Sequence, residues 1–194
     1  QLDSFLKVVG DAKANGIQFK YQHVANSPAS INYPDAYLDM VRPGMGLAGL
    51  YPSDAFRDLV TLKCPITWKT NISLIRSVKA NHPISYGDSR IFPIDTTIVI
   101  IPTGTADGFG KRFEGTGYVL IRGEQHQVVG VTMDQTMIVL STDYPDLTIG
   151  EEVVLIGAQG EKEQDPALIQ KQTGYQTEEL CCQISYRVPR IYIN

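Results

Sequence analysis

Apolar side chains recur every three or four positions at the start of the chain, at Leu2, Phe5, Leu6, Val9 and Ala12. In a helix of 3.6 residues per turn these positions form one apolar stripe, so the pattern predicts an amphipathic helix. Asn15-Gly16 follows as a typical helix end. Residues 17–21 then alternate apolar and polar side chains, which predicts a strand.

Asn26 and Ser27 are good helix-capping residues, and they predict a short helix that ends at Asn32-Tyr33-Pro34. Residues 37–50 predict another strand that leads to a glycine-rich end. The first 50 residues therefore predict alternating helices and strands. Such a short alternation cannot close a barrel, so we expect further units of the same kind to precede it in the whole protein.

Helical periodicity almost disappears after residues 51–53. Runs rich in Ile, Val and Thr, separated by turn signals, predict strands at 62–77, 96–102, 117–121, 127–131, 137–140 and 152–156. Asp165-Pro166 predicts the start of one late helix, and residues 182–193 predict a final strand. The expected fold class is α+β, with domains at 1–55 and 56–194, the second mostly β.

Composition excludes two classes of protein. A chain of 194 residues with 43% hydrophobic side chains can bury a core. Its longest apolar runs, at 98–101 and 153–156, are far shorter than the ~20 residues of a membrane helix. The net charge of -4, without a polybasic block, argues against nucleic-acid binding. We expect no membrane and no nucleic-acid partner.

Cysteine and histidine positions indicate neither a disulfide framework nor a metal site. The three cysteines are Cys64 and the adjacent pair Cys181 and Cys182, which favours reduced thiols and a cytoplasmic protein. The pair falls within the expected final strand, where packing is its expected role. The histidines are scattered at His23, His82 and His126, so no metal is predicted.

Three polar clusters each allow two interpretations. Asn26-Ser27 is either a helix cap, the commoner case, or a phosphate site. The glycines at 44 and 46 either end a strand or let backbone amides approach a ligand. Residues 103–108 favour a hairpin turn, because their spacing fits no general nucleotide loop.

The order of the motifs is more specific than any one of them. Seven motifs follow one another along the chain: HVANSPAS at 23–30, DMVRPG at 39–44, ISYG at 84–87, IP…ADG at 101–108, VG at 129–130, MDQ at 133–135 and ISYRVPR at 184–190. In this order the chain resembles the C-terminal half of bacterial alanine racemases. The resemblance implies the last βα elements of a (β/α)8 barrel followed by a β-rich domain. It also implies pyridoxal 5'-phosphate as cofactor and interconversion of L- and D-alanine for cell-wall synthesis.

The resemblance assigns roles to individual residues. Those that match the family's phosphate cradle are Asn26, Ser27, Gly44, Met45 and the Tyr186 hydroxyl. Arg42 matches the arginine that faces the pyridine nitrogen, and His23 matches the residue that supports this arginine. Met133 and Asp134 match positions that reach the partner's site in a head-to-tail homodimer, where they meet the amino-acid substrate.

Two departures from the family pattern leave alternatives open. Every lysine of the chain matches a later, non-catalytic part of the family, so the cofactor-binding lysine is expected in a missing N-terminal barrel half. Thr105 is expected at the position of the family's acid–base tyrosine, and an aliphatic hydroxyl is too weak an acid to replace a phenol. The chain alone is therefore expected to be inactive. The alternatives are altered chemistry, such as retro-aldol cleavage or transamination, and a non-catalytic dimerisation or binding module.

Overall fold

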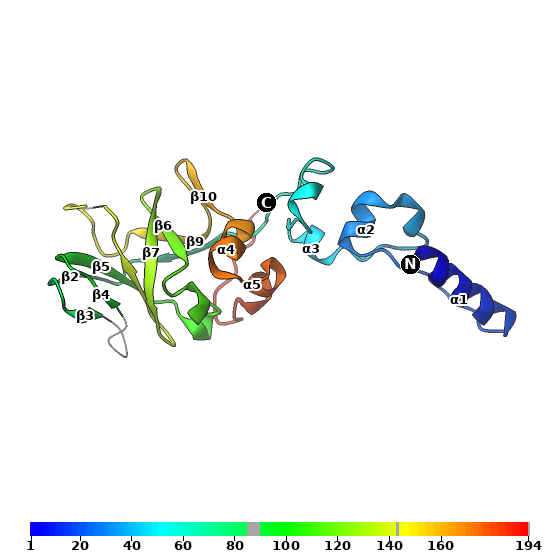
Figure 1. Cartoon of the computed structure of the whole chain (residues 1–194), viewed down its shortest axis with the longest axis horizontal. Helices are drawn as coiled ribbons and strands as arrows, with labels where there is room; N and C mark the ends of the chain where they lie inside the picture. Colours follow the sequence, from blue (N-terminus) through cyan, green and yellow to red (C-terminus); the bar gives the residue numbers. More distant parts are fainter. Residues whose placement is uncertain (85–89, 143, 194) are drawn as a thin grey trace. The chain divides into compact units, whose positions relative to one another are not determined.

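The computed structural model describes residues 1–84, 90–142 and 144–193 (Figure 1). Its contacts divide the chain into two compact parts, Gln1–Pro65 (unit 1) and Ile66–Asn194 (unit 2). The division expected at residue 55 stays a prediction. Residues 85–87 of the ISYG motif lie outside the described residues.

Unit 1 is built from short helices joined by irregular chain. Its elements are α1 (Leu2–Ala14), α2 (Ser27–Asn32), η1 (Pro34–Ala36), α3 (Gly44–Leu47) and η2 (Asp54–Phe56). The first helix is confirmed, and the Asn26 side chain caps α2 by accepting the Ala29 N–H at 3.2 Å. Local signals, namely periodicity and a capping side chain, were sufficient to identify these two helices.

The strands expected at 17–21 and 37–50 do not form. Their region contains one isolated parallel bridge, Asn26 to Arg42, and the glycine-rich end becomes α3. Residues 22–25 and 39–42 run side by side, since Asp39 N–H donates to Gln22 O at 3.1 Å and Arg42 N–H to Ala25 O at 2.9 Å. A parallel strand is stabilised by neighbours on both sides, and among the described residues these two segments pair only with each other. Both strand predictions are therefore wrong.

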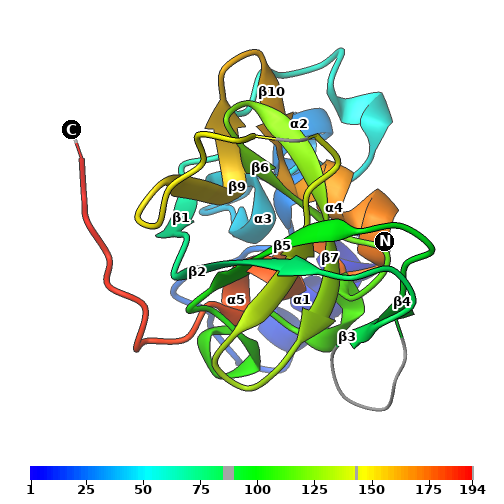
Figure 2. The ribbon, with the colours of Figure 1, turned by 90° about the vertical axis from the view of Figure 1, so that its left-hand side faces the viewer.

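Unit 2 holds an antiparallel sheet in which eight strands are described (Figures 1 and 2). The order is β1-β9-β6-β7-β8-β5-β2, with β10 paired to β9. The bounds are β1 (Trp68–Asn71), β2 (Leu74–Val78), β5 (Thr96–Ile101), β6 (Tyr118–Ile121), β7 (Glu124–Val131), β8 (Thr136–Val139), β9 (Glu152–Gln159) and β10 (Lys162–Gln164). A separate hairpin pairs β3 (Pro83–Ile84) with β4 (Arg90–Ile91). The β-rich second part is confirmed.

One hydrophobic core organises unit 2. Phe109 and Phe113 stack with ring centroids 3.9 Å apart, and Trp68 meets Phe109 edge-on at 6.0 Å. The helices α4 (Pro166–Thr173) and α5 (Thr177–Gln183) contribute the fully buried Ile169 and Leu180 to the same core. The late helix is thus confirmed, with Asp165 accepting the Leu168 N–H at 2.6 Å as its cap.

Two expectations for unit 2 are wrong. The final strand expected at 182–193 is replaced by α5, which contains Cys181 and Cys182, and by irregular chain up to residue 193. Glu178 and Glu179 in the first turn favour the helix, because their charges complement its N-terminus. The hairpin turn expected at 103–108 is instead a 3₁₀ turn, η4 (Thr105–Asp107), which leads into η5 (Lys111–Phe113).

Candidate functional site

Arg42 and His23 form a hydrogen-bonded pair in unit 1. The Arg42 Nη1 lies 2.7 Å from His23 Nδ1. A guanidinium can only donate, so Nδ1 accepts and any ring proton sits on Nε2. The backbone pairing of the segments around 22–26 and 39–42 sets this register. The structure therefore brings together the two residues that sequence reasoning placed together.

Ser27 lies beside the start of α3. Its side chain is almost fully buried, and its Oγ accepts the Gly46 N–H at 3.1 Å. Within the described part of the chain, the Met45 N–H has no acceptor. A hydroxyl and a free amide at this point are neutral donors of the kind that hold a phosphate. The residues present in unit 1 therefore fit a phosphorylated cofactor.

Thr105 meets the Met133–Asp134 loop in unit 2. The Thr105 N–H donates to Thr132 O at 3.0 Å, and the Ala106 N–H donates to Met133 O at 2.9 Å. A Cβ on Gly104 would lie 2.5 Å from Thr132 O, so only glycine permits this close approach. The side chains of Thr105, Met133 and Asp134 line one open depression, and Met133 is 72% exposed. Three expected site residues thus share one surface.

Tyr186 is the expected phosphate-binding residue that belongs to unit 2. It belongs to unit 2 and is 96% exposed, whereas Ser27, Arg42 and Met45 belong to unit 1. Its convergence with them stays a prediction. Within unit 2 its segment is attached to η4, because Ser185 N–H donates to Asp107 O at 2.9 Å.

One residue near the candidate site, Asp107, was missed by sequence reasoning. Its nearly buried carboxylate pairs with Arg187 Nε at 3.1 Å. The signal for Asp107 was present, because an acidic residue between apolar segments needs a partner once buried. That partner lies 80 positions away in the printed sequence, beyond any local pattern.

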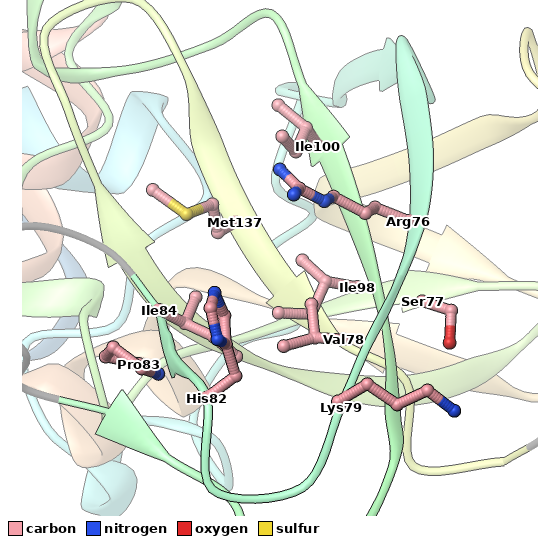
Figure 3. Close-up of a pocket in the computed structure, with 10 residues that line it drawn as sticks. All are labelled: Arg76, Ser77, Val78, Lys79, His82, Pro83, Ile84, Ile98, Ile100 and Met137. Carbon is pink, nitrogen blue, oxygen red and sulfur yellow. The ribbon is translucent and has the colours of Figure 1, made fainter.

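A second pocket lies between β2, β5, β8 and β3, with a volume of about 310 Å³ (Figure 3). Val78, Ile98 and Met137 give it an apolar lining, and His82 points toward it. Lys79 at its edge is paired with Asp95 at 2.7 Å. This pocket contains none of the expected site residues, and among the described residues no cluster suited to a metal ion is found.

The part of the chain that the structure describes contains no helix of sufficient length and apolar character to cross a membrane.

Two family models match the sequence. "Alanine racemase, N-terminal domain" matches residues 1–52, and "Alanine racemase, C-terminal domain" matches residues 65–192.

Curated relatives carry the same description. The alanine racemase of Carboxydothermus hydrogenoformans is 40% identical over 195 residues, which cover 100% of this chain and 53% of the relative. The alanine racemase of Symbiobacterium thermophilum is 38% identical, over 99% of this chain and 51% of its own length. The chain spans about half the length of the curated relatives that it matches.

Solved structures agree with this fold. Alanine racemase from Bacillus anthracis with bound L-Ala-P superposes with a TM-score of 0.91 at 32% identity, covering 100% of this chain and 50% of that one. Alanine racemase of Clostridium difficile in complex with cycloserine gives 0.79 at 38% identity, covering 92% and 47%. The α+β architecture expected from the sequence, barrel elements followed by a β domain, is confirmed.

Proposed function

Because the chain belongs to the alanine racemase family, we propose that it is part of a pyridoxal-phosphate-dependent enzyme that interconverts L- and D-alanine. The observation that carries the proposal is the unit 1 cluster, in which the Arg42–His23 pair and the Ser27–Gly46 contact lie on adjoining segments. The missing N-terminal barrel half would supply the cofactor-binding lysine.

Unit 1 supplies most of the proposed phosphate cradle. Ser27 Oγ and the Met45 amide act as neutral donors, while Asn26 and Gly44 fix the backbone on which they stand. We propose that the Tyr186 hydroxyl, from unit 2, also binds the phosphate. Neutral donors suit a dianionic phosphate because they hold it rigidly without a mobile counter-charge.

Arg42 is proposed to face the pyridine nitrogen. When bound, pyridoxal phosphate makes the Cα proton of an amino acid acidic by withdrawing electrons from it. The guanidinium keeps its own protons, so Arg42 donates a hydrogen bond and leaves the nitrogen unprotonated. His23 holds the guanidinium in place through its 2.7 Å contact. The consequence is a weaker electron sink, which limits side reactions.

Racemisation removes a proton on one face of Cα and delivers one on the other, so two acid–base groups are required. Thr105 stays the proposed position of the family's second group. Its hydroxyl is too weak an acid for the task. The experiment below tests whether Thr105 occupies this position.

Met133 and Asp134 are proposed to reach the partner's site in a head-to-tail homodimer. Their exposed loop, fixed against η4 by backbone hydrogen bonds, fits this role. We place the enzyme in the cytoplasm, where its three cysteines stay reduced, with D-alanine for peptidoglycan as its product. An amino acid is the proposed substrate, with no nucleic-acid or membrane partner.

One observation favours a second candidate function. The depression beside Thr105 is open, so a substrate with a larger side chain could enter where a bulky phenol would stand. This favours retro-aldol cleavage or transamination of β-hydroxy amino acids. Binding of pyridoxal phosphate would persist in that case, whereas a non-catalytic dimerisation module would not bind it.

The test uses the full-length protein that contains this chain, loaded with pyridoxal phosphate. Initial rates of deuterium incorporation at Cα are measured for L- and D-alanine. If Thr105 occupies the acid–base position, the wild type has one strong acid–base group and exchanges the two enantiomers at unequal rates. Thr105→Tyr then raises racemisation by about 10²–10⁴-fold and makes the two exchange rates equal. Equal exchange of both enantiomers by the wild type, at the rate of Thr105→Tyr, would mean that another residue supplies the second group. A wild-type protein that neither binds pyridoxal phosphate nor exchanges the Cα proton of alanine contradicts the proposed function.

A further inference from the structure

Tyr186 is exposed on a segment that is otherwise anchored. Its neighbours Ile184 and Val188 are partly buried against the core of unit 2. They flank Tyr186 at a spacing of two residues, so they hold the backbone on both sides while its ring points to solvent. A side chain that meets a ligand binds better when its backbone is fixed in advance.

Asp107 joins this segment to the loop that carries Thr105. Its carboxylate is 11% exposed; Oδ2 accepts the Gly104 N–H at 2.9 Å and Oδ1 pairs with Arg187 Nε at 3.1 Å. Its backbone oxygen also accepts the Ser185 N–H at 2.9 Å. One residue therefore contacts both neighbours of Tyr186 in the chain.

Arg190, at the C-terminal end of the same segment, binds its backbone. Its guanidinium donates to the carbonyl oxygens of Ile184 at 2.7 Å, of Ser185, and of Val188 at 2.8 Å. A planar guanidinium can satisfy several carbonyls at once in a fixed geometry. Residues 184–190 thus form a closed turn. Asp107 connects this turn to η4 through its backbone oxygen and its carboxylate.

We propose that Asp107, acting through Arg187, is a positioning residue that holds Tyr186 ready for the phosphate of the cofactor. The inference rests on the proposed function, in which the Tyr186 hydroxyl belongs to the phosphate cradle. The nearly buried carboxylate is screened less by water than a surface pair. When a side chain is ordered before binding, the affinity for the ligand rises by about two- to tenfold.

The experiment compares Arg187→Gln with wild type in the full-length protein. Amide hydrogen exchange of residues 184–190 is measured without cofactor, and we expect it to accelerate in the variant. Equilibrium dialysis then measures affinity for pyridoxal phosphate and for pyridoxal, which lacks the phosphate. We expect about two- to tenfold weaker binding of pyridoxal phosphate and unchanged binding of pyridoxal. Arg187→Lys, which keeps the charge, should restore part of the affinity.

Two further variants make the outcome specific. Lys69→Gln removes an exposed ion pair with Glu152 on β1 and β9, and it should change neither measurement. Tyr186→Phe should weaken pyridoxal phosphate binding, and adding Arg187→Gln to it should cause no further loss. Unchanged exchange, an equal loss for pyridoxal, or additive losses would each overturn the inference. Failure of the wild type to bind pyridoxal phosphate would instead overturn the proposed function, since the exchange measurement needs no cofactor.

Discussion

The two units bury their apolar side chains to very different extents. Unit 1, whose residues are all described, buries only Val9, Ala25, Ala36 and Leu50 among its hydrophobic residues. It leaves Val8 66% and Leu47 76% exposed. In unit 2 one core runs from Trp68 to Leu180 and includes residues from the sheet, from η5 and from both helices, together with Phe109 between η4 and η5. Burial of apolar area is the main favourable term in folding, so unit 2 contains its own source of stability and unit 1 does not.

The difference teaches that the expected site residues stand on two parts of the chain with unequal packing. The Arg42–His23 pair and the Ser27 contact stand on the weakly packed unit. Thr105, Met133 and Tyr186 stand on the well-packed one. Four predictions test this comparison, beginning with the largest effect.

Limited proteolysis of the isolated chain should separate the units. We expect rapid cleavage within residues 1–65, because few buried contacts oppose local opening, and survival of a fragment that covers 66–194. Mass spectrometry of the time course identifies the surviving fragment. Equal resistance of both units would contradict the comparison.

Phe113→Ala should destabilise unit 2 by about 3–5 kcal/mol, because it opens a cavity beside Phe109 and Tyr175. Urea unfolding followed by fluorescence of Trp68, the one tryptophan of the chain, measures the loss. The matched control in unit 1 is Phe19→Ala, at a residue that is 45% exposed. This control should leave the Trp68 transition unchanged, and a comparable loss from it would show that the units unfold together.

Gly104→Ala should cost about 1–3 kcal/mol, since the new methyl group would lie 2.5 Å from Thr132 O and force two backbone segments apart. Gly46→Ala in unit 1 has its nearest contact at 3.6 Å, with Ser27, and should change stability by less than about 0.5 kcal/mol. Circular dichroism during urea unfolding measures both. If the two variants behave alike, the tight approach at Gly104 has no energetic role.

Acid should lower the stability of unit 2, because His126 is protonated more readily in the unfolded chain than in the folded one. Burial lowers the pKa of this imidazole, whose Nδ1 accepts the Ser141 N–H at 3.1 Å. The unfolded chain therefore binds the proton at a higher pH than the folded chain does. The contribution of His126 to stability is complete above about pH 6.5, the pKa of histidine in an unfolded chain, and it falls as the pH drops toward the lower pKa of the folded state. One group limits the slope to about 1.4 kcal/mol per pH unit.

Thermal unfolding of unit 2 between pH 8 and 5 measures this slope. His126→Gln should flatten it in this range, because the titrating group is gone. His23→Gln in unit 1 should leave the slope of unit 2 unchanged. A slope that persists in His126→Gln would assign the acid sensitivity to another group.

Local patterns in the sequence determined many elements correctly. The stripe of α1, the Asn26 and Asp165 caps, and the β-branched runs of β5, β6 and β9 each act within a few neighbouring residues. These features follow from backbone propensity and side-chain periodicity, which need no distant partner. The contact between His23 and Arg42 was instead implied by the family resemblance, because no local pattern connects the two residues.

Tertiary structure decided the features whose hydrogen-bond partners are distant or absent. Residues 17–21 and 184–188 both alternate like strands, yet neither pairs as one: the first lacks strand neighbours, and the second is held by Arg190 and Asp107. The sheet order, the glycine required at 104 and the partner of Asp107 were likewise undetermined by any local pattern. The sequence specifies which faces are apolar and which residues can cap a helix. Which distant segment satisfies each backbone and carboxylate group is settled only when the chain packs, because that choice depends on contacts across the whole unit.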